Sequence, residues 1–199
     1  MLFRSAMIRA AGVPLAAPSA NKFGHVSPTT AQHVRDELGD AVDLVVDGGP
    51  SATGVESTII GWDEQGQPLL LRPGGLPAEN IEAILGPLRR ATDEQKRPQA
   101  PGMLPRHYAP RTPMRLCATV EALPEDAGNS AGLLVLRPPD REVASRFAVV
   151  EVLSATGDLR EAAANLFAAM RRLDASQLKS LWAVRVPEQG LGIAINDRL

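Results

Sequence analysis

Cysteine is nearly absent from this 199-residue sequence, since Cys117 is the only one. A single cysteine excludes an internal disulfide and a zinc site built from several cysteines, and it fits a protein of the reducing cytoplasm. Long apolar runs are also absent: no stretch approaches the roughly 20 residues that a membrane-spanning helix needs, and no cleavable signal pattern opens the chain. With 44% hydrophobic residues, the sequence has the composition of a globular protein, built as one large domain or two small ones.

The chain also lacks a large excess of charge of either sign. Its formal net charge is −2 and its pI is near 5.9, so it has no basic surface for tight, non-specific nucleic-acid binding, and any anionic ligand must be met by local groups. There is no G-x-G-x-x-G fingerprint, no internal repeat and no evident nucleophile-base triad. His25 and His33 have no partner at a useful spacing, and we interpret both as surface or helix residues.

The stretch from Pro14 to Thr30 reads P-L-A-A-P-S-A-N-K-F-G-H-V-S-P-T-T and has features of an anion-binding turn. The apolar run 13–17 predicts a buried strand end, and the turn after it places Ser19 and Asn21 at its mouth. Ser27 and the proline after it predict the N-cap and first residue of a helix that extends to about residue 38. Free backbone N–H groups and the helix dipole would meet an anion there, although these polar side chains would also satisfy the local backbone without a ligand.

Hydrophobic periodicity divides the rest of the chain into an α/β pattern with a break in the middle. Before the break we expect helices over residues 1–12 and 78–85 and strands over 42–46, 55–62 and 68–72. Residues 89–113 are polar and proline-rich, which predicts a linker. After it we expect strands over 114–117, 132–136, 148–153 and 181–186, alternating with helices over 158–173 and 190–199. We therefore predict domains over 1–87 and 114–199, joined by a linker over 88–113, with a largely parallel sheet in the second domain.

Four further residues are candidates for ligand binding. Ser57 opens a strand after a glycine-containing loop, and Arg72 ends a strand with a permanently charged, planar group that suits a phosphate or carboxylate. His107 and Tyr108 lie in the linker, where a side chain resting over a nucleotide would close the site against water. The sequence leaves the alternatives open: strand-edge hydrogen bonding, a solvated arginine and an ordinary loop pair.

Four motifs carry a resemblance that runs nearly from end to end. P-L-A-A-P-S-A-N-x-F-G-x-x-S-P-T-T is followed by G-V-E-S-T (54–58) and L-L-R-P-G (70–74), and P-G-M-L-P-R-H-Y-A-P (101–110) lies in the expected linker. The first group resembles the YrdC-like family of threonylcarbamoyl-AMP synthases. The linker motif is similar to that of the family's long, two-domain form.

The resemblance implies an enzyme that condenses L-threonine, bicarbonate and ATP into threonylcarbamoyl-AMP and pyrophosphate, for threonylcarbamoyladenosine in tRNA. It implies a YrdC-like twisted α/β sheet, a linker that folds back over the site, and a small Rossmann-like α/β domain. Ser19, Ser27, Arg72, Tyr108 and His107 would hold the nucleotide, with Asn21 ordering the turn or touching the nucleotide. The backbone of Ala17 and the Ser57 side chain would hold threonine. Mg²⁺ would accompany ATP with few protein ligands, and the product would pass to the tRNA threonylcarbamoyl-transfer machinery.

The sequence departs from the family pattern in one respect. Family members carry a Lys-x-Arg element well upstream of the S-A-N turn, and no comparable element is present here. We therefore expect a truncated chain with impaired activity, whose first domain is unstable alone or associates. A hydrogenase-maturation carbamoyltransferase is a second enzyme hypothesis, disfavoured by the single cysteine. A non-catalytic RNA- or nucleotide-binding module remains the alternative from another class.

Overall fold

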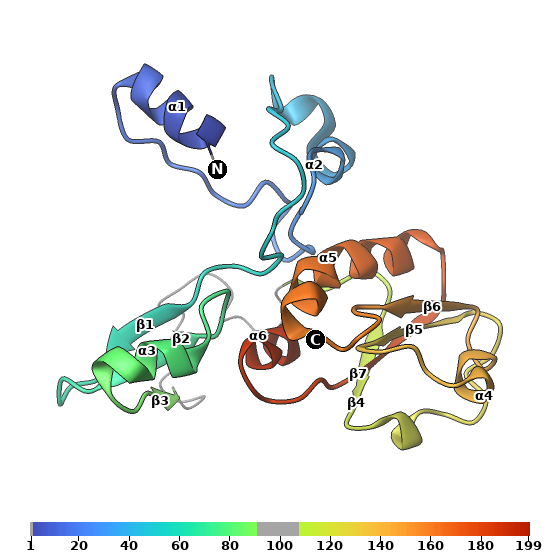
Figure 1. The fold of residues 1–199 in the computed structure, drawn as a ribbon. Helices are drawn as coiled ribbons and strands as arrows, with labels where there is room; N and C mark the ends of the chain where they lie inside the picture. The colour runs from blue at the N-terminus through green and yellow to red at the C-terminus, as the bar shows by residue number, and fades with distance from the viewer. Residues whose placement is uncertain (1, 91–107) are drawn as a thin grey trace.

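Two separate β-sheets organise the computed structural model, which describes residues 2–90 and 108–199 (Figure 1). Residues 2–90, called here the N-terminal part, contain a three-stranded sheet of order β1-β2-β3. Residues 108–199, the C-terminal part, contain a four-stranded sheet of order β4-β7-β5-β6. The expected mixed α/β organisation is therefore confirmed.

The N-terminal sheet is a hairpin with one short added strand. β1 (Ile59–Trp62) pairs antiparallel with β2 (Pro68–Arg72), and β3 (Arg89–Arg90) pairs parallel with β2. Asp63 shapes the hairpin turn, because its Oδ1 accepts hydrogen bonds from the backbone N–H groups of Gln65 at 3.0 Å and Gln67 at 2.8 Å. α3 (Ala78–Leu85) connects β2 to β3. The predicted hairpin and the helix over 78–85 are confirmed, with β1 shorter than the expected strand 55–62.

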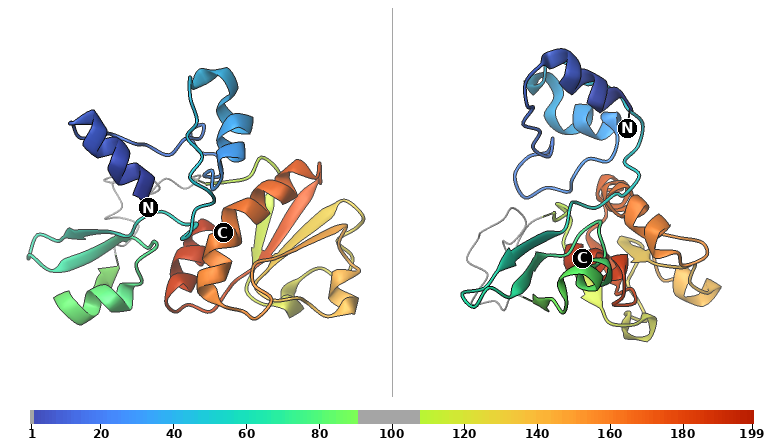
Figure 2. Two further views of the ribbon diagram at one scale, coloured as in Figure 1. Left: turned by 45° about the horizontal axis from the view of Figure 1, so that its top comes forward. Right: turned by 60° about the vertical axis from the view of Figure 1, so that its left-hand side comes forward.

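Two helices precede this sheet and are raised above the rest of the molecule (Figure 2). α1 (Leu2–Ala11) confirms the helix predicted over 1–12. α2 (Ala31–Leu38) begins later than predicted, because Thr30 and not Ser27 is its N-cap: the Thr30 side chain accepts a hydrogen bond from the His33 N–H at 3.2 Å. The hydroxyl of Ser27 donates instead to Glu56. A 3₁₀ turn, η1 (Gly39–Ala41), follows α2.

The strands predicted over residues 13–17 and 42–46 are wrong, because both segments are irregular. Their large apolar side chains Val13, Leu15, Leu44 and Val46 are between 49% and 79% exposed. An apolar run becomes a strand only when another strand supplies hydrogen-bond partners for its backbone. No described segment pairs with either run.

The C-terminal sheet is parallel throughout, as predicted. Its strands are β4 (Met114–Cys117), β5 (Ala131–Val135), β6 (Val149–Val152) and β7 (Ser180–Val184). The connections contain η2 (Val120–Ala122), α4 (Arg141–Ala144) and α5 (Leu159–Ala175), and α6 (Leu191–Arg198) follows β7. α5 and α6 cover one face and η2 and α4 the other, so the sheet is buried on both faces.

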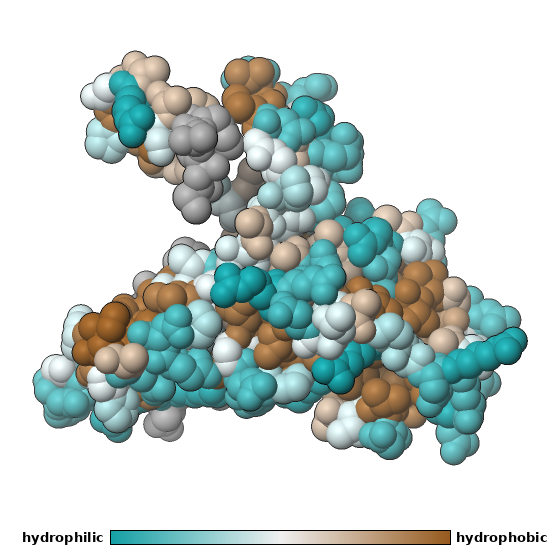
Figure 3. All heavy atoms as spheres, in the orientation of Figure 1, coloured by the Kyte–Doolittle hydropathy of each residue, from teal (hydrophilic) through white to brown (hydrophobic). Residues whose placement is uncertain are grey.

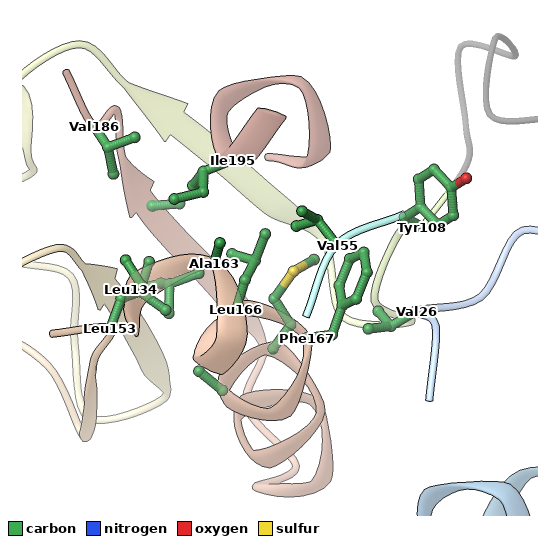
Figure 4. Packing of buried hydrophobic residues seen from close by; sticks show 14 of the residues in the cluster. Val26, Val55, Tyr108, Leu134, Leu153, Ala163, Leu166, Phe167, Val186 and Ile195 are labelled. Atoms are coloured by element: carbon green, nitrogen blue, oxygen red, sulfur yellow. The ribbon is translucent and has the colours of Figure 1, made fainter. Parts of the chain in front are cut away.

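α5 is the central helix of the molecule. Asp158 is its N-cap and accepts from the Glu161 N–H at 2.7 Å, and its apolar stripe is buried at Ala162, Leu166, Ala169 and Leu173. The core that it forms with the sheet also includes Val26, Val55 and Tyr108, which come from outside the sheet (Figure 4). α5 therefore joins the N-terminal part to the C-terminal part, and the candidate site lies at this junction. No helix among the described residues is long and apolar enough to cross a membrane.

Candidate functional site

A cavity of about 810 Å³ lies beside α5, between the segment that leads into α2 and the loop that leads into β1. Its walls come from Ser19 and Ala20, from residues 27–31 and 45–56, and from Phe167 of α5. Figure 3 shows the surface hollowed between the raised segments and the body of the molecule. This volume suits a small organic ligand, since such pockets typically measure about 300–1,000 Å³.

Ser27 is held at the wall of this cavity by a buried chain of hydrogen bonds. Its hydroxyl donates to Oε1 of Glu56 at 2.7 Å, and Oε2 of the same carboxylate accepts from Nε of Arg198 at 2.9 Å. Ser27 is 7% exposed and Arg198 only 3%. Because the Ser27 hydroxyl donates its hydrogen bond to Glu56, its oxygen lone pairs stay available to accept a hydrogen bond from a ligand.

Arg72 organises a second cluster at the end of β2. Its Nε and Nη2 donate to the carbonyl oxygen of Ser57 at 3.1 and 2.9 Å, and Nη2 also lies 3.3 Å from the Ser57 hydroxyl. Nη1 donates to the hydroxyl oxygen of Tyr108 at 3.2 Å. Three residues that the sequence analysis selected independently, Ser57, Arg72 and Tyr108, thus meet around one guanidinium group.

Tyr108 is buried and adopts a backbone conformation that tyrosine rarely takes. Its φ is 62°, a left-handed value that costs an L-residue about 1–2 kcal/mol. Its ring packs against Phe167 with a centroid separation of 5.7 Å (Figure 4), and the Arg198 guanidinium lies 4.9 Å from the ring centroid. Burial raises the pKa of the hydroxyl and the Glu56 charge adds to this, whereas Arg72 and Arg198 oppose it. Tyr108 is therefore a neutral hydrogen-bonding group at neutral pH.

The other predicted residues are placed differently. Ser19 lines the cavity together with Ser27, whereas Ala17 lies in an exposed irregular segment away from the cavity lining. Asn21 orders its own turn: Nδ2 donates to the carbonyl oxygens of Lys22 at 3.0 Å and His25 at 3.1 Å. His107 lies outside the described residues.

A charged contact fastens the stretch around Ser27 to α5. Nη1 of Arg171 donates to Oε2 of Glu37 at 3.1 Å, and its Nη2 and Nε donate to the carbonyl oxygens of Val26 and Ser27. Glu37 Oε1 also lies 2.7 Å from Nδ1 of His25, whose side chain is 40% exposed, so His25 is a surface residue as expected but has a partner that its sequence spacing did not indicate. Burial acts to raise the pKa of Glu37, but hydrogen bonds from Arg171, the Lys22 N–H and His25 outweigh it and lower that pKa.

His33 lies in α2, as predicted, and its Nδ1 accepts from the Thr29 N–H at 3.2 Å. Burial and the nearby charge of Arg171 lower its pKa. An acceptor nitrogen requires the neutral ring, so the geometry and the direction of the pKa agree. His33 is therefore neutral at physiological pH.

The chain returns to this region directly after residue 107. The Ala109 N–H donates to the carbonyl oxygen of Gly24 at 3.1 Å, which forms an isolated parallel bridge between His25 and Ala109. Asp174 of α5 then accepts from the Thr112 N–H at 2.8 Å and from Nε of Arg111 at 3.3 Å. The residues that follow Tyr108 are thus bound both to Gly24 of the N-terminal part and to α5 of the C-terminal part.

Family models cover nearly the whole chain. Residues 3–74 match the model described as "Telomere recombination", and residues 76–199 match the model described as "Threonylcarbamoyl-AMP synthase, C-terminal domain". The chain belongs to the threonylcarbamoyl-AMP synthase family. The resemblance inferred from the sequence motifs is therefore confirmed.

Relatives in this family are similar along most of the chain. A threonylcarbamoyl-AMP synthase of Bacillus subtilis is 36% identical over 98% of this chain and 58% of its own length, and one of Pyrococcus abyssi is 36% identical over 94% and 56%. The crystal structure of P. abyssi Sua5 complexed with L-threonine matches with a TM-score of 0.80 and 34% identity, over 97% of this chain and 58% of that one. The chain thus spans just over half the length of these synthases.

Glu56, Arg171 and Arg198 are the residues of this site that sequence reasoning missed. Glu56 stood in a quoted motif, but nothing in the motif marked its carboxylate as the partner of Ser27. The Glu56–Arg198 contact joins residues 142 positions apart, and the Arg171–Ser27 contact joins residues 144 apart. No local pattern carries such information, because these pairs are brought together only by the docking of α5 and α6.

Proposed function

We propose that this chain binds ATP and L-threonine and takes part in the synthesis of threonylcarbamoyl-AMP and pyrophosphate from L-threonine, bicarbonate and ATP. One observation carries the proposal: the residues that the resemblance implicates in substrate binding lie in two clusters joined by Arg198. Ser27, at the wall of the cavity of about 810 Å³, shares Glu56 with Arg198, and Ser57 and Tyr108 meet around the Arg72 guanidinium beside the Arg198 side chain. Threonylcarbamoyl-AMP is the intermediate for threonylcarbamoyladenosine in tRNA.

The nucleotide is assigned to Ser19, Ser27, Arg72 and Tyr108. Arg72 is the group best suited to an oxyanion, because its charge is permanent and its guanidinium already presents donors in a fixed plane. The Tyr108 hydroxyl is neutral and contacts Arg72, so it offers one hydrogen-bonding group beside the guanidinium. The proposal extends to His107 of the same segment and to Asn21 as the residue that orders the turn.

Threonine is assigned to Ser57 and to the backbone of Ala17. Ser57 is exposed, and its hydroxyl faces the Arg72 guanidinium, so a carboxylate bound there would meet a fixed positive charge. The L-threonine complex of the similar P. abyssi protein supports an amino-acid site in this family.

The reaction requires positioning and charge neutralisation more than a protein nucleophile. Threonine and bicarbonate would condense to a carbamate with loss of water. The carbamate would then attack the α-phosphorus of ATP, and pyrophosphate would leave with the electrons of the broken P–O bond. Mg²⁺ would neutralise phosphate charge; the described residues provide no cluster of three or more metal-ligating side chains, so the phosphates and water would supply most of its ligands. What this chain contributes is the fixed donor set around Arg72 and Ser27.

The proposal also assigns a role to each part of the chain and a cellular location to the protein. Residues 1–87 would belong to the catalytic domain, 88–113 to a linker that crosses the site, and 114–199 to a small Rossmann-like accessory domain. The return of residues 108–112 to Gly24 and α5 supports the path of the linker. The protein would act in the cytoplasm, and its product would pass to the tRNA threonylcarbamoyl-transfer machinery.

Calorimetric titration with ATP and with L-threonine, combined with an assay of pyrophosphate release, tests the proposal. We expect saturable binding of both ligands, weakened at least about tenfold for ATP by Arg72→Met, a loss of about 1.4 kcal/mol. Arg35→Met, which changes an exposed arginine of α2, is the matched control. Absence of both ATP and threonine binding would refute the proposal. Salt-sensitive RNA affinity without pyrophosphate release would favour the binding-module alternative.

A further inference from the structure

Arg198 is a buried arginine of the C-terminal part that makes its contacts in the candidate site of the N-terminal part. Its side chain is 0% exposed, although it lies on the last turn of α6. A buried guanidinium is costly unless its donors are all directed at partners. Each of the three guanidinium nitrogens of Arg198 has a hydrogen-bonding partner.

Two of those partners belong to the site, and the third is the neighbouring residue of α6. Nε donates to Oε2 of Glu56 at 2.9 Å, Nη2 donates to the carbonyl oxygen of Pro73 at 3.1 Å, and Nη1 pairs with the neighbouring Asp197. The guanidinium also lies over the ring of Tyr108 at 4.9 Å from its centroid. One side chain therefore contacts the motif of Glu56, the residue that follows Arg72, and the aromatic ring that Arg72 reaches.

The Glu56 carboxylate is shared between Arg198 and Ser27, and this fixes what Ser27 can do. With Oε2 held by Arg198, Oε1 accepts a hydrogen bond from the Ser27 hydroxyl, so the Ser27 oxygen is an acceptor toward the cavity. Without Arg198, the carboxylate, which is 17% exposed, would keep only the Ser27 hydroxyl as a side-chain partner among the contacts described here. It would then turn toward water and release Ser27.

We propose that Arg198 is a positioning residue through which α6 completes the nucleotide site: it holds Glu56 so that Ser27 presents a hydrogen-bond acceptor to ATP, and it fixes the Tyr108 ring beside Arg72. The inference rests on the proposed function, because it assigns Ser27 and Tyr108 to the nucleotide. It gives the C-terminal part a role in binding that does not require a ligand of its own.

Arg198→Met and Arg198→Lys, studied in the full chain, test the proposal. Methionine keeps much of the volume and removes the charge, whereas lysine keeps the charge for Glu56 but loses the planar group. We expect Arg198→Met to weaken ATP binding at least about tenfold and Arg198→Lys to recover part of the loss. Arg146→Met is the matched control, because Arg146 follows α4 and its guanidinium pairs with Glu142 of that helix, away from the site.

Tyr108 reports directly on the contact with Arg198, and the dissociation constant for ATP separates the positioning role from a merely structural one. It is the only tyrosine of the chain, so labelling its ζ carbon with a magnetic isotope gives a single NMR signal. We expect Arg198→Met to shift this signal and Arg146→Met to leave it unchanged. A merely structural arginine would lower the melting temperature and the fraction of protein able to bind, while the dissociation constant for ATP stayed the same.

The outcomes separate this inference from the function on which it rests. Wild-type protein that binds ATP, with an unchanged dissociation constant in Arg198→Met, overturns the inference alone. Wild-type protein that does not bind ATP overturns the proposed function and the inference together. If Arg198→Met does not fold, Glu56→Gln and Arg198→Lys provide the same comparison, because each weakens the Glu56–Arg198 pair with little change in volume.

Discussion

Replacing Arg171 by methionine should loosen α2 and the Ser27 stretch from α5. The substitution removes the ion pair with Glu37 and the donors to the Val26 and Ser27 carbonyl oxygens. Hydrogen bonds to charged groups contribute about 1.5–3 kcal/mol each in favourable cases. Arg171 and Glu37 are 17% and 11% exposed, and Glu37 keeps two other partners, so we expect a loss of about 2 kcal/mol.

A loss of that size lowers the melting temperature by about 4–8 °C in a chain of this length. Calorimetric unfolding measures it, and amide hydrogen exchange should show faster exchange in α2 than in the C-terminal sheet, because the broken contact is local. Arg35→Met on the exposed side of α2 is the control and should leave both quantities unchanged. A double-mutant cycle with Glu37→Gln should give a coupling of about 1 kcal/mol. A coupling near zero, or unchanged exchange in α2, would refute the reasoning.

Three further predictions follow from the backbone and the pKa directions. Gly54→Ala should cost about 3 kcal/mol or more in thermal unfolding, because a Cβ there would lie 2.1 Å from a carbonyl oxygen of α5, whereas Gly49→Ala, with positive φ but open space, should cost only about 1 kcal/mol. Tyr108 has a raised pKa, so its stabilising contribution is complete below pH about 10 and is lost as the pH rises through the folded pKa; phenolate absorbance should titrate higher in native protein than in urea. Asp158→Ala removes the bond to the Glu161 N–H and should cost about 1 kcal/mol, with Asp158→Asn as the control that keeps the cap.

The sequence predicted correctly those elements whose formation depends on interactions between residues close together in the chain. The turn from Asp63 to Gln67 closes β1 and β2 through hydrogen bonds to one carboxylate, and the stripe of α5 repeats with the helical period, so both were visible in the sequence. The N-cap of α2 was misassigned because both Ser27 and Thr30 are residue types that cap helices, and serine is the better cap of the two. The choice is made by Glu56, 29 residues away, which takes the Ser27 hydroxyl.

The strands predicted over 13–17 and 42–46 failed for a related reason. Apolar composition gives a segment the capacity to be buried, but a strand also requires a neighbour that supplies backbone partners. The site shows the same limit: Arg72, Ser57 and Tyr108 were recognised as candidates from motifs, whereas Arg198 was invisible until α6 placed it against Glu56. Residue types at a site can thus be read from sequence, but their partners depend on the assembled fold.

The distribution of buried side chains predicts which half of the chain can fold alone. All the large side chains below 2% exposure among the described residues lie between Leu133 and Ile195, and the buried residues Val26 and Val55 of the N-terminal part belong to the core around α5. Residues 1–90 alone would expose these side chains and would keep only a small hairpin sheet with α3, which is marginal in water. We expect fragment 108–199 to unfold cooperatively, and fragment 1–90 to give a poorly dispersed amide spectrum and to associate in light scattering. A monomeric, well-dispersed fragment 1–90 would contradict this, because its stability would then have to come from contacts other than those with α5 and α6.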